Sequence, residues 1–348
     1  MENQNTPVIT HESKNRIRVD YEGKLSFKER LMRKLKTSNT WLVAVVNVFR
    51  FILMLGVSYV IIQPFIAKIA GSFMTKEDVI DATVSLIPKH FTLEIYEAII
   101  VENSYFEALL NTLILSLLCA IIQTFVACLI GYGLAKFKFA GNNIVMIAVI
   151  VTMIIPHSTL KLAMNQHFFS FDLFTVIAWN YEGPIEAIFG KTLQLGDSYW
   201  PLAILSFCGL AFKNGLYIYL MRQFFKGVPD ELEESAYVDG SGVFRTFFSI
   251  ILPLSVPMMI TIFLFAFSWQ WTDEFYTKLF FSDVGGVALM PGVVAIPNSL
   301  KTSYAGQTLY YNVINNTAGM MVIAPLIILY LFCQRYLVQG IERSGLVG

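Results

Sequence analysis

The sequence predicts an all-α polytopic membrane protein: six transmembrane helices, with a short cytoplasmic helix–turn–helix between the fourth and the fifth. Two observations predict this class. Of the 348 residues, 55% are hydrophobic and only 14% are charged, and the mean hydropathy is +0.59, whereas a soluble domain carries roughly 25% charged residues. The apolar residues also gather into runs of about twenty, the length that crosses a bilayer core. Helices are expected because barrel-type alternation is absent and lipid offers backbone groups no partners.

Six apolar runs define the predicted spans. The first follows a polar, basic segment, residues 1–40, which we treat as a separate N-terminal segment before the membrane domain, residues 41–348. The third contains Pro156, whose ring and missing N–H kink a helix. The last is strictly apolar only from Met320 to Phe332, and its flanks bring it to a spanning length. In chain order the spans are about 41–66, 109–135, 144–162, 200–221, 254–271 and 317–337.

The distribution of lysine and arginine predicts the orientation, because these residues concentrate in cytoplasmic loops. Segment 1–40 carries nine of them. With that segment in the cytoplasm, six spans place seven more on the same side, against seven in the three longer loops on the other side. Both termini are therefore predicted to be cytoplasmic, and the long loops at about 70–107, 163–199 and 272–317 to lie outside.

The connection at about 226–253 is predicted to form two short helices. Pro229 suits the first position of a helix, and the acidic residues at 230–234 complement the positive helix end. Gly240 is placed to end this helix in a left-handed cap. Ser241 can cap a second helix, from Val243 to Leu252, which we expect to end at Pro253. The expected object is a helix–turn–helix against the cytoplasmic face.

Several motifs of this chain resemble those of ABC importer permeases, most closely the second permease subunits of maltose and multiple-sugar systems. The loop carries the main resemblance to the family's "EAA" loop, with serine where the family usually has a second alanine. The region after the second span, 132–141, and the tail, 334–340, resemble further family signatures, so the resemblance covers about residues 105–348. The matching loop residues are Glu234, Ser235, Ala236, Asp239, Gly240, Leu252 and Pro253.

The resemblance implies a transport role without catalysis in this chain. In such permeases the loop docks on a cytoplasmic ATPase, so Glu234 and Ala236 are expected to contact it and Gly240 to permit the turn. The implied partners are a second, similar permease, two ATPase copies, an external solute-binding protein and a sugar. The implied location is a bacterial cell membrane. ATP and magnesium would belong to the ATPase, and no nucleic-acid partner is expected.

The residues themselves argue against other activities. The stretch from Gly183 to Thr192 resembles a phosphate-binding loop, but six residues separate its glycines where that motif has four. The histidines and cysteines show no metal-ligand spacing, so no cofactor or metal site is predicted. The alternative function is a self-sufficient secondary carrier, which would need buried carboxylates and inverted repeats. We find neither, and a membrane scaffold is a more distant third reading.

Four residues are candidates for a substrate path. Lys213 and Asn214 lie near the middle of the predicted fourth span. They either line the path or bond to a neighbouring helix, and the sequence leaves both open. Trp269 and Trp271 end the fifth span, where tryptophan is common at membrane interfaces. Because helical positions two residues apart do not share a face, we expect one to anchor in lipid and the other to face a cavity, where its ring could pack on a sugar.

Overall fold

The computed structural model describes residues 8–13, 16–20, 38–172, 183–281, 286–304 and 307–345. The chain forms two compact units, residues 1–67 and 68–348. Seven of the nine basic residues in segment 1–40 lie outside the described residues; Arg16 and Arg18 lie within them.

The first unit contains a β-hairpin and most of one long helix. Strands β1 (Val8–Ser13) and β2 (Arg16–Asp20) pair antiparallel, with Val8 opposite Asp20; the sequence analysis did not predict this hairpin. Helix α2 (Ser38–Gly71) has 34 residues, about 51 Å at 1.5 Å per residue. It contains the predicted first span, and it is long and apolar enough to cross a membrane.

The second unit is a helical bundle built around α5 (Tyr105–Lys136). Helices α10 (Asn214–Lys226) and α13 (Leu252–Trp271) pack on α5, α17 (Thr308–Gly345) packs on α13, and α6 (Asn142–Ile154) packs on α10. The fully buried core includes Tyr217, Met221 and Phe225 of α10 and Ile262 of α13. The predicted second, fifth and sixth spans are confirmed as long apolar helices.

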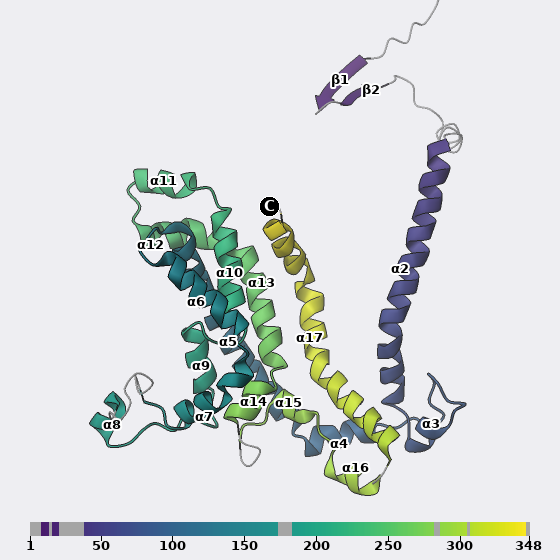
Figure 1. The fold of residues 1–348 in the computed structure, drawn as a ribbon. Helices are drawn as coiled ribbons and strands as arrows, with labels where there is room; N and C mark the ends of the chain where they lie inside the picture. The colour runs from purple at the N-terminus through teal and green to yellow at the C-terminus, as the bar shows by residue number, and fades with distance from the viewer. Residues whose placement is uncertain are drawn as a thin grey trace, which may run out of the picture. The chain divides into compact units, whose positions relative to one another are not determined.

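Short helices occupy the two ends of this bundle (Figure 1). One end, called here the α11 end, carries α11 (Glu231–Val238) and α12 (Val243–Thr246). The opposite end, called the α16 end, carries the helices that connect the long ones: α3 (Lys76–Ile80), α4 (Glu94–Glu102), α7 (Lys161–Phe169), α8 (Pro184–Phe189), α14 (Phe275–Phe280), α15 (Met290–Val293) and α16 (Asn298–Ser303). Asn103 ties two of them together by donating to the carbonyls of Val293 (2.9 Å) and Ala295 (2.8 Å).

Two of the predicted spans are not continuous helices, so the prediction for 144–162 and 200–221 is wrong in this respect. Helix α6 ends at Ile154, and the chain continues through the 3-10 turn His157–Leu160 into α7 after a 92° bend. Pro156 stands at this break and has no N–H to continue the helical ladder. Among the described residues, four helices are long and apolar enough to span, or five if this bent pair counts as one.

The fourth predicted span is interrupted in its middle. Helix α9 (Trp200–Phe207) ends before Cys208, and α10 begins only at Asn214. Gly209 and Lys213 between them have positive φ values of 72° and 66°, which a continuous right-handed helix cannot contain. Lys213 is therefore the residue that precedes α10, and not a residue within a helix as the sequence analysis assumed.

Candidate functional site

The loop at the α11 end turns at Gly240, which has a φ of +81°. The backbone N–H of Ser241 donates to the carbonyl of Ala236 (2.9 Å), and that of Gly240 donates to Tyr237 (3.0 Å). A Cβ on Gly240 would meet nothing within 4 Å. Glycine is therefore required by the left-handed backbone and not by lack of space, and the predicted turn is confirmed.

The helix after this turn differs from the prediction. The sequence predicts an end at Pro253, whereas α12 runs through a π-helical turn, Phe247–Ile251, directly into α13. Leu252 is half-buried and Pro253 is exposed, both in the first turn of α13. A proline cannot donate to the residue one turn earlier. The wider π turn lies just before it, where the hydrogen-bond ladder has to shift.

The loop is fixed to α5 by a lysine that the sequence analysis counted only for its charge. The Lys136 side chain is 6% exposed, although it ends α5. Its Nζ donates to the carbonyl of Val228 (2.6 Å) and to the Asp230 carboxylate (2.5 Å). This hydrogen bond and the charge of Lys136 lower the pKa of Asp230. Nearby, the Tyr132 ring of α5 packs on Phe225 and Phe247, with centroids 5.4 Å and 4.8 Å away. Two residues of α5 thus hold the loop: Lys136 through its hydrogen bonds and Tyr132 through its ring contact with Phe247.

The residues expected to contact an ATPase do not share one surface. Glu234, Ser235 and Asp239 are exposed, whereas Ala236 is buried under the turn. The most exposed apolar side chains of the loop are Val238 at 88% and Phe244 at 81%, and sequence reasoning did not single them out. For Val238 the available signal was its apolar character beside the acidic residues at 230–239, whereas Phe244 follows in a largely apolar stretch that does not mark it.

The two helix breaks meet at a cavity of about 270 Å³, lined by residues 152–157 and 210–213 together with Gly215 and Leu216. The Lys213 Nζ lies 4.8 Å from the ring centroid of Phe212 and 5.1 Å from that of Trp269, and the two rings are 5.5 Å apart. Cations over aromatic faces are held by the ring quadrupole. The structure therefore brings two candidate path residues, Lys213 and Trp269, into one cluster.

A histidine also belongs to this cluster, although its position in the sequence predicts no metal site. His157 follows the break at Pro156, and its Nδ1 shares a hydrogen bond with the Tyr276 hydroxyl. Its ring contacts Phe212 edge-on, with centroids 5.1 Å apart. No sequence signal links residue 157 to residue 212; only the fold places the two breaks together.

The other two candidate path residues lie outside the cluster. Asn214 is fully buried and donates to the carbonyl of Ser206 (3.4 Å). Trp271 is 1% exposed, and its Nε1 donates to the carbonyl of Val322 in α17 (2.9 Å), whereas Trp269 is 48% exposed. The two tryptophans thus occupy different environments, but Trp271 is buried against α17 and is not the lipid anchor that the sequence predicts for one of the pair. Trp271 holds α13 to α17, and only Trp269 is available to a ligand.

Comparison with known protein families gives one match over most of the chain. The model of the family described as "Binding-protein-dependent transport system inner membrane component" matches residues 123–343. The matched region contains α10, the loop at the α11 end, α13 and most of α17.

Individual relatives match over nearly their full length. The polygalacturonan/rhamnogalacturonan transport system permease protein YtcP of Bacillus subtilis is 26% identical, covering 86% of this chain and 97% of the relative. The probable starch degradation products transport system permease protein AmyC of Thermoanaerobacterium thermosulfurigenes is 29% identical, covering 80% and 89%. A solved bacterial ABC transporter involved in alginate import aligns with a TM-score of 0.64 at 18% identity, covering 86% of this chain and 98% of that one. The last likeness supports the fold alone.

Proposed function

The chain belongs to the family of binding-protein-dependent transport system inner membrane components, and we propose that it is a permease subunit of an ATP-driven carbohydrate importer. Members of this family are transport permeases and not enzymes. The substrate class is supported by the relatives, whose names are those of permeases for polygalacturonan/rhamnogalacturonan, starch degradation products and arabinooligosaccharides. A self-sufficient secondary carrier is not retained, because the family works with a separate binding protein.

The proposal includes six membrane crossings. Helices α2, α5, α13 and α17 supply four. The bent pair α6–α7 and the broken pair α9–α10 would supply the third and fourth. Interrupted helices are accepted inside a membrane where they line a cavity, which is where both breaks lie.

Both termini and the α11 end are proposed to be cytoplasmic, on the strength of the lysine and arginine distribution. Cysteines introduced near Lys14 and Gly345 should resist membrane-impermeant thiol reagents in intact cells. A cysteine near Ser303, in α16, should react. Labelling of either terminus from outside would contradict the topology.

The loop at the α11 end is proposed to dock on a cytoplasmic ATPase, with Glu234, Ser235 and Asp239 on its exposed polar side. Val238 and Phe244 would fill an apolar cleft of the partner. Lys136 would pass the motion of the docked loop to α5, because its two hydrogen bonds cross from α5 to the loop. Two ATPase copies, a second permease and an external binding protein complete the proposed complex.

Sugar is proposed to pass the cluster around Lys213 and Trp269. Aromatic rings pack on the C–H faces of sugars, and the Lys213 ammonium and the His157 imidazole offer hydrogen bonds to hydroxyls. A cavity lined by a few polar groups and aromatic rings is the usual form of such a site. Alternating access would follow from movement at the two breaks that border this cavity.

The family match across the loop, together with the exposed Val238, carries the proposal. The test is the complex purified from cells that express the whole transport system. Val238→Asp should release the ATPase in detergent and abolish the ATP hydrolysis stimulated by the sugar-loaded binding protein. The matched control is Val101→Asp, because Val101 is 76% exposed on α4 at the opposite end, and the ATPase should remain bound. Retention of the ATPase by the Val238→Asp complex would refute the docking surface.

A further inference from the structure

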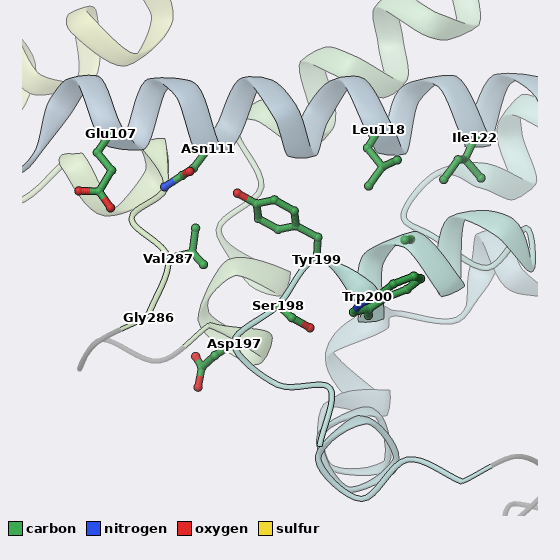
Figure 2. A pocket seen from close by; sticks show the side chains of 11 residues that line it. Glu107, Asn111, Leu118, Ile122, Asp197, Ser198, Tyr199, Trp200, Gly286 and Val287 are labelled. Atoms are coloured by element: carbon green, nitrogen blue, oxygen red, sulfur yellow. The ribbon is translucent and has the colours of Figure 1, made fainter. Parts of the chain in front are cut away.

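Two hollows of the second unit differ in the charge of their walls. A groove of about 850 Å³ on the side of α5 is lined by Glu107 and Asp197, and its described lining contains no basic side chain; Figure 2 shows both carboxylates. The cavity of about 270 Å³ at the two helix breaks, called here the break cavity, is lined by Lys213, and its described lining contains no carboxylate. Of the two, only the break cavity suits a negatively charged solute.

The Lys213 ammonium has no oxygen partner in the described part of the chain. Its contacts there are the rings of Phe212 and Trp269, whose centroids lie 4.8 Å and 5.1 Å from Nζ. Lys136 shows how an enclosed lysine is satisfied elsewhere in the same unit, because its Nζ donates to a carbonyl and to a carboxylate. An ammonium has three donors, so those of Lys213 are available to a solute.

The other titratable residues of this cluster do not neutralise Lys213. The Asp273 carboxylate accepts the N–H of Tyr276 (3.0 Å), at the start of α14, and forms no ion pair with Lys213. The His157 imidazole shares its hydrogen bond with the Tyr276 hydroxyl. Lys213 precedes the 13 residues of α10 and so lies about 20 Å from the other end of that helix, well inside the membrane domain. Ionisable residues at such depth are costly and usually functional.

The ends of two helices add to the polarity of the break cavity. Helix α10 has no side-chain cap at its start, and Gly215 and Leu216 of its first turn line the cavity. The backbone N–H groups of a first turn carry the positive end of the helix. At the other break, the carbonyl of Thr152 has no N–H four residues later, because residue 156 is proline. The cavity therefore offers positive charge to a carboxylate and a carbonyl acceptor to hydroxyls.

We propose that Lys213 selects a saccharide that carries a carboxylate, of the uronic-acid class, as it passes the break cavity. The carboxylate pairs with the Lys213 ammonium, and the C–H face of the sugar packs on the Trp269 ring, which is 48% exposed. Ring hydroxyls bond to His157 and to the Thr152 carbonyl. A neutral sugar would leave the ammonium without an acceptor. This assignment rests on the proposed function as a saccharide permease and narrows its substrate class.

The test is direct binding of monosaccharide probes to the purified, nucleotide-free complex, measured by saturation-transfer difference NMR. The probes are galacturonate, galactose and galactose 6-sulfate, which differ only in the group at carbon 6. Wild type should bind galacturonate about tenfold more tightly than galactose, the scale of one charge-assisted hydrogen bond. Lys213→Gln should abolish this preference, and Lys213→Arg, which keeps the charge, should retain it. The control Lys301→Gln removes an exposed lysine on α16 and should leave the preference unchanged.

Four results would overturn the proposal. Equal affinity of wild type for galacturonate and galactose would exclude selection by charge, and this comparison needs no variant. A preference that survives in Lys213→Gln would exclude Lys213, and its loss in Lys213→Arg would exclude the charge as the cause. Tighter binding of galactose 6-sulfate than of galacturonate would assign the site to sulfate esters.

Two features of the design keep these outcomes separate from other failures. Lys213→Met, whose thioether still packs on aromatic rings, takes the place of Lys213→Gln if that variant does not assemble. The binding measurement needs neither ATP turnover nor the binding protein. A negative result is therefore distinct from failure of the transport function, which the ATPase retention of Val238→Asp tests.

Discussion

Gly131→Ala should separate α10 from α5, and Gly133→Ala, two residues away, should not. An added Cβ at Gly131 would lie 2.6 Å from Met221 Cβ and 2.9 Å from the Arg222 backbone nitrogen, whereas one at Gly133 would meet nothing within 4 Å. Both glycines are inside α5, so the helix-propensity change is the same. The pair isolates the close approach of the two helices.

The size of the perturbation follows from these distances. Ordinary contact of a Cβ begins at about 3.4 Å, so α10 must retreat by 3.4 − 2.6 = 0.8 Å at Met221 and by 3.4 − 2.9 = 0.5 Å at Arg222. Neither atom is the end of a flexible side chain, so the helix backbone has to move. Overpacking of this kind costs about 1–3 kcal/mol, and both variants gain about 1 kcal/mol of helix propensity. The two variants should therefore differ by about 1–3 kcal/mol.

The assay is thermal unfolding of the purified complex for both variants under one set of conditions. Gly131→Ala should unfold at a lower temperature than wild type, and Gly133→Ala at an equal or higher one. Arg222 also donates to the carbonyl of Leu134 (3.4 Å) at the α11 end. A displaced α10 should therefore weaken ATPase stimulation before assembly is lost. Equal unfolding temperatures for the two variants would refute the close-packing argument.

Three further outcomes are expected. Gly240→Val should uncouple ATP hydrolysis from transport because φ is +81°, and Gly242→Val, in the same loop at φ −78°, should not; equal activities would exclude backbone strain. Trp269→Ala should lower sugar uptake in a fully assembled complex, whereas Trp271→Ala should destabilise the complex by about 3–5 kcal/mol, as measured by unfolding; reversed phenotypes would contradict the assignment. Burial raises the pKa of Asp273 from 3.8 to about 6, so the folded state binds more protons between these values and stability should fall as pH rises through this range. Asp273→Asn should flatten the pH dependence of the unfolding temperature. An unchanged slope would show that another titrating group causes this dependence.

The long spans could be predicted because their signal is an average over many residues. Helices α5, α13 and α17 each contain a continuous apolar run, and hydropathy reports such runs regardless of packing. The breaks in the third and fourth spans leave that average almost unchanged. Pro156 predicts a kink but not the size of the bend, which is 92°. Glycine is a common residue type in membrane helices, so the presence of Gly209 does not reveal its positive φ.

The candidate site was predictable residue by residue but not as an arrangement. Lys213 and Trp269 were singled out separately, one as a buried charge and the other as an interface aromatic. Their contact depends on the break between α9 and α10 and on how α10 and α13 pack on α5. The bond from Lys136 to Asp230 joins residues 94 apart in the sequence. A single sequence has no local pattern for a contact over that separation.

The short helices of the bundle also bear on how the chain enters the membrane during synthesis. Helix α6 has 13 residues, about 20 Å, and α9 has eight, about 12 Å, so neither covers a core about 30 Å thick. α6 packs closely on α10 at Gly215, where an added Cβ would lie 2.6 Å from Thr152 Oγ1. This contact cannot form until Gly215 has been synthesised. That glycine follows Ile154 by about sixty residues, or roughly 3–12 s of translation. During this interval α6 has to be sheltered by α5 or by the insertion machinery, so the proposed third and fourth crossings should enter the bilayer together.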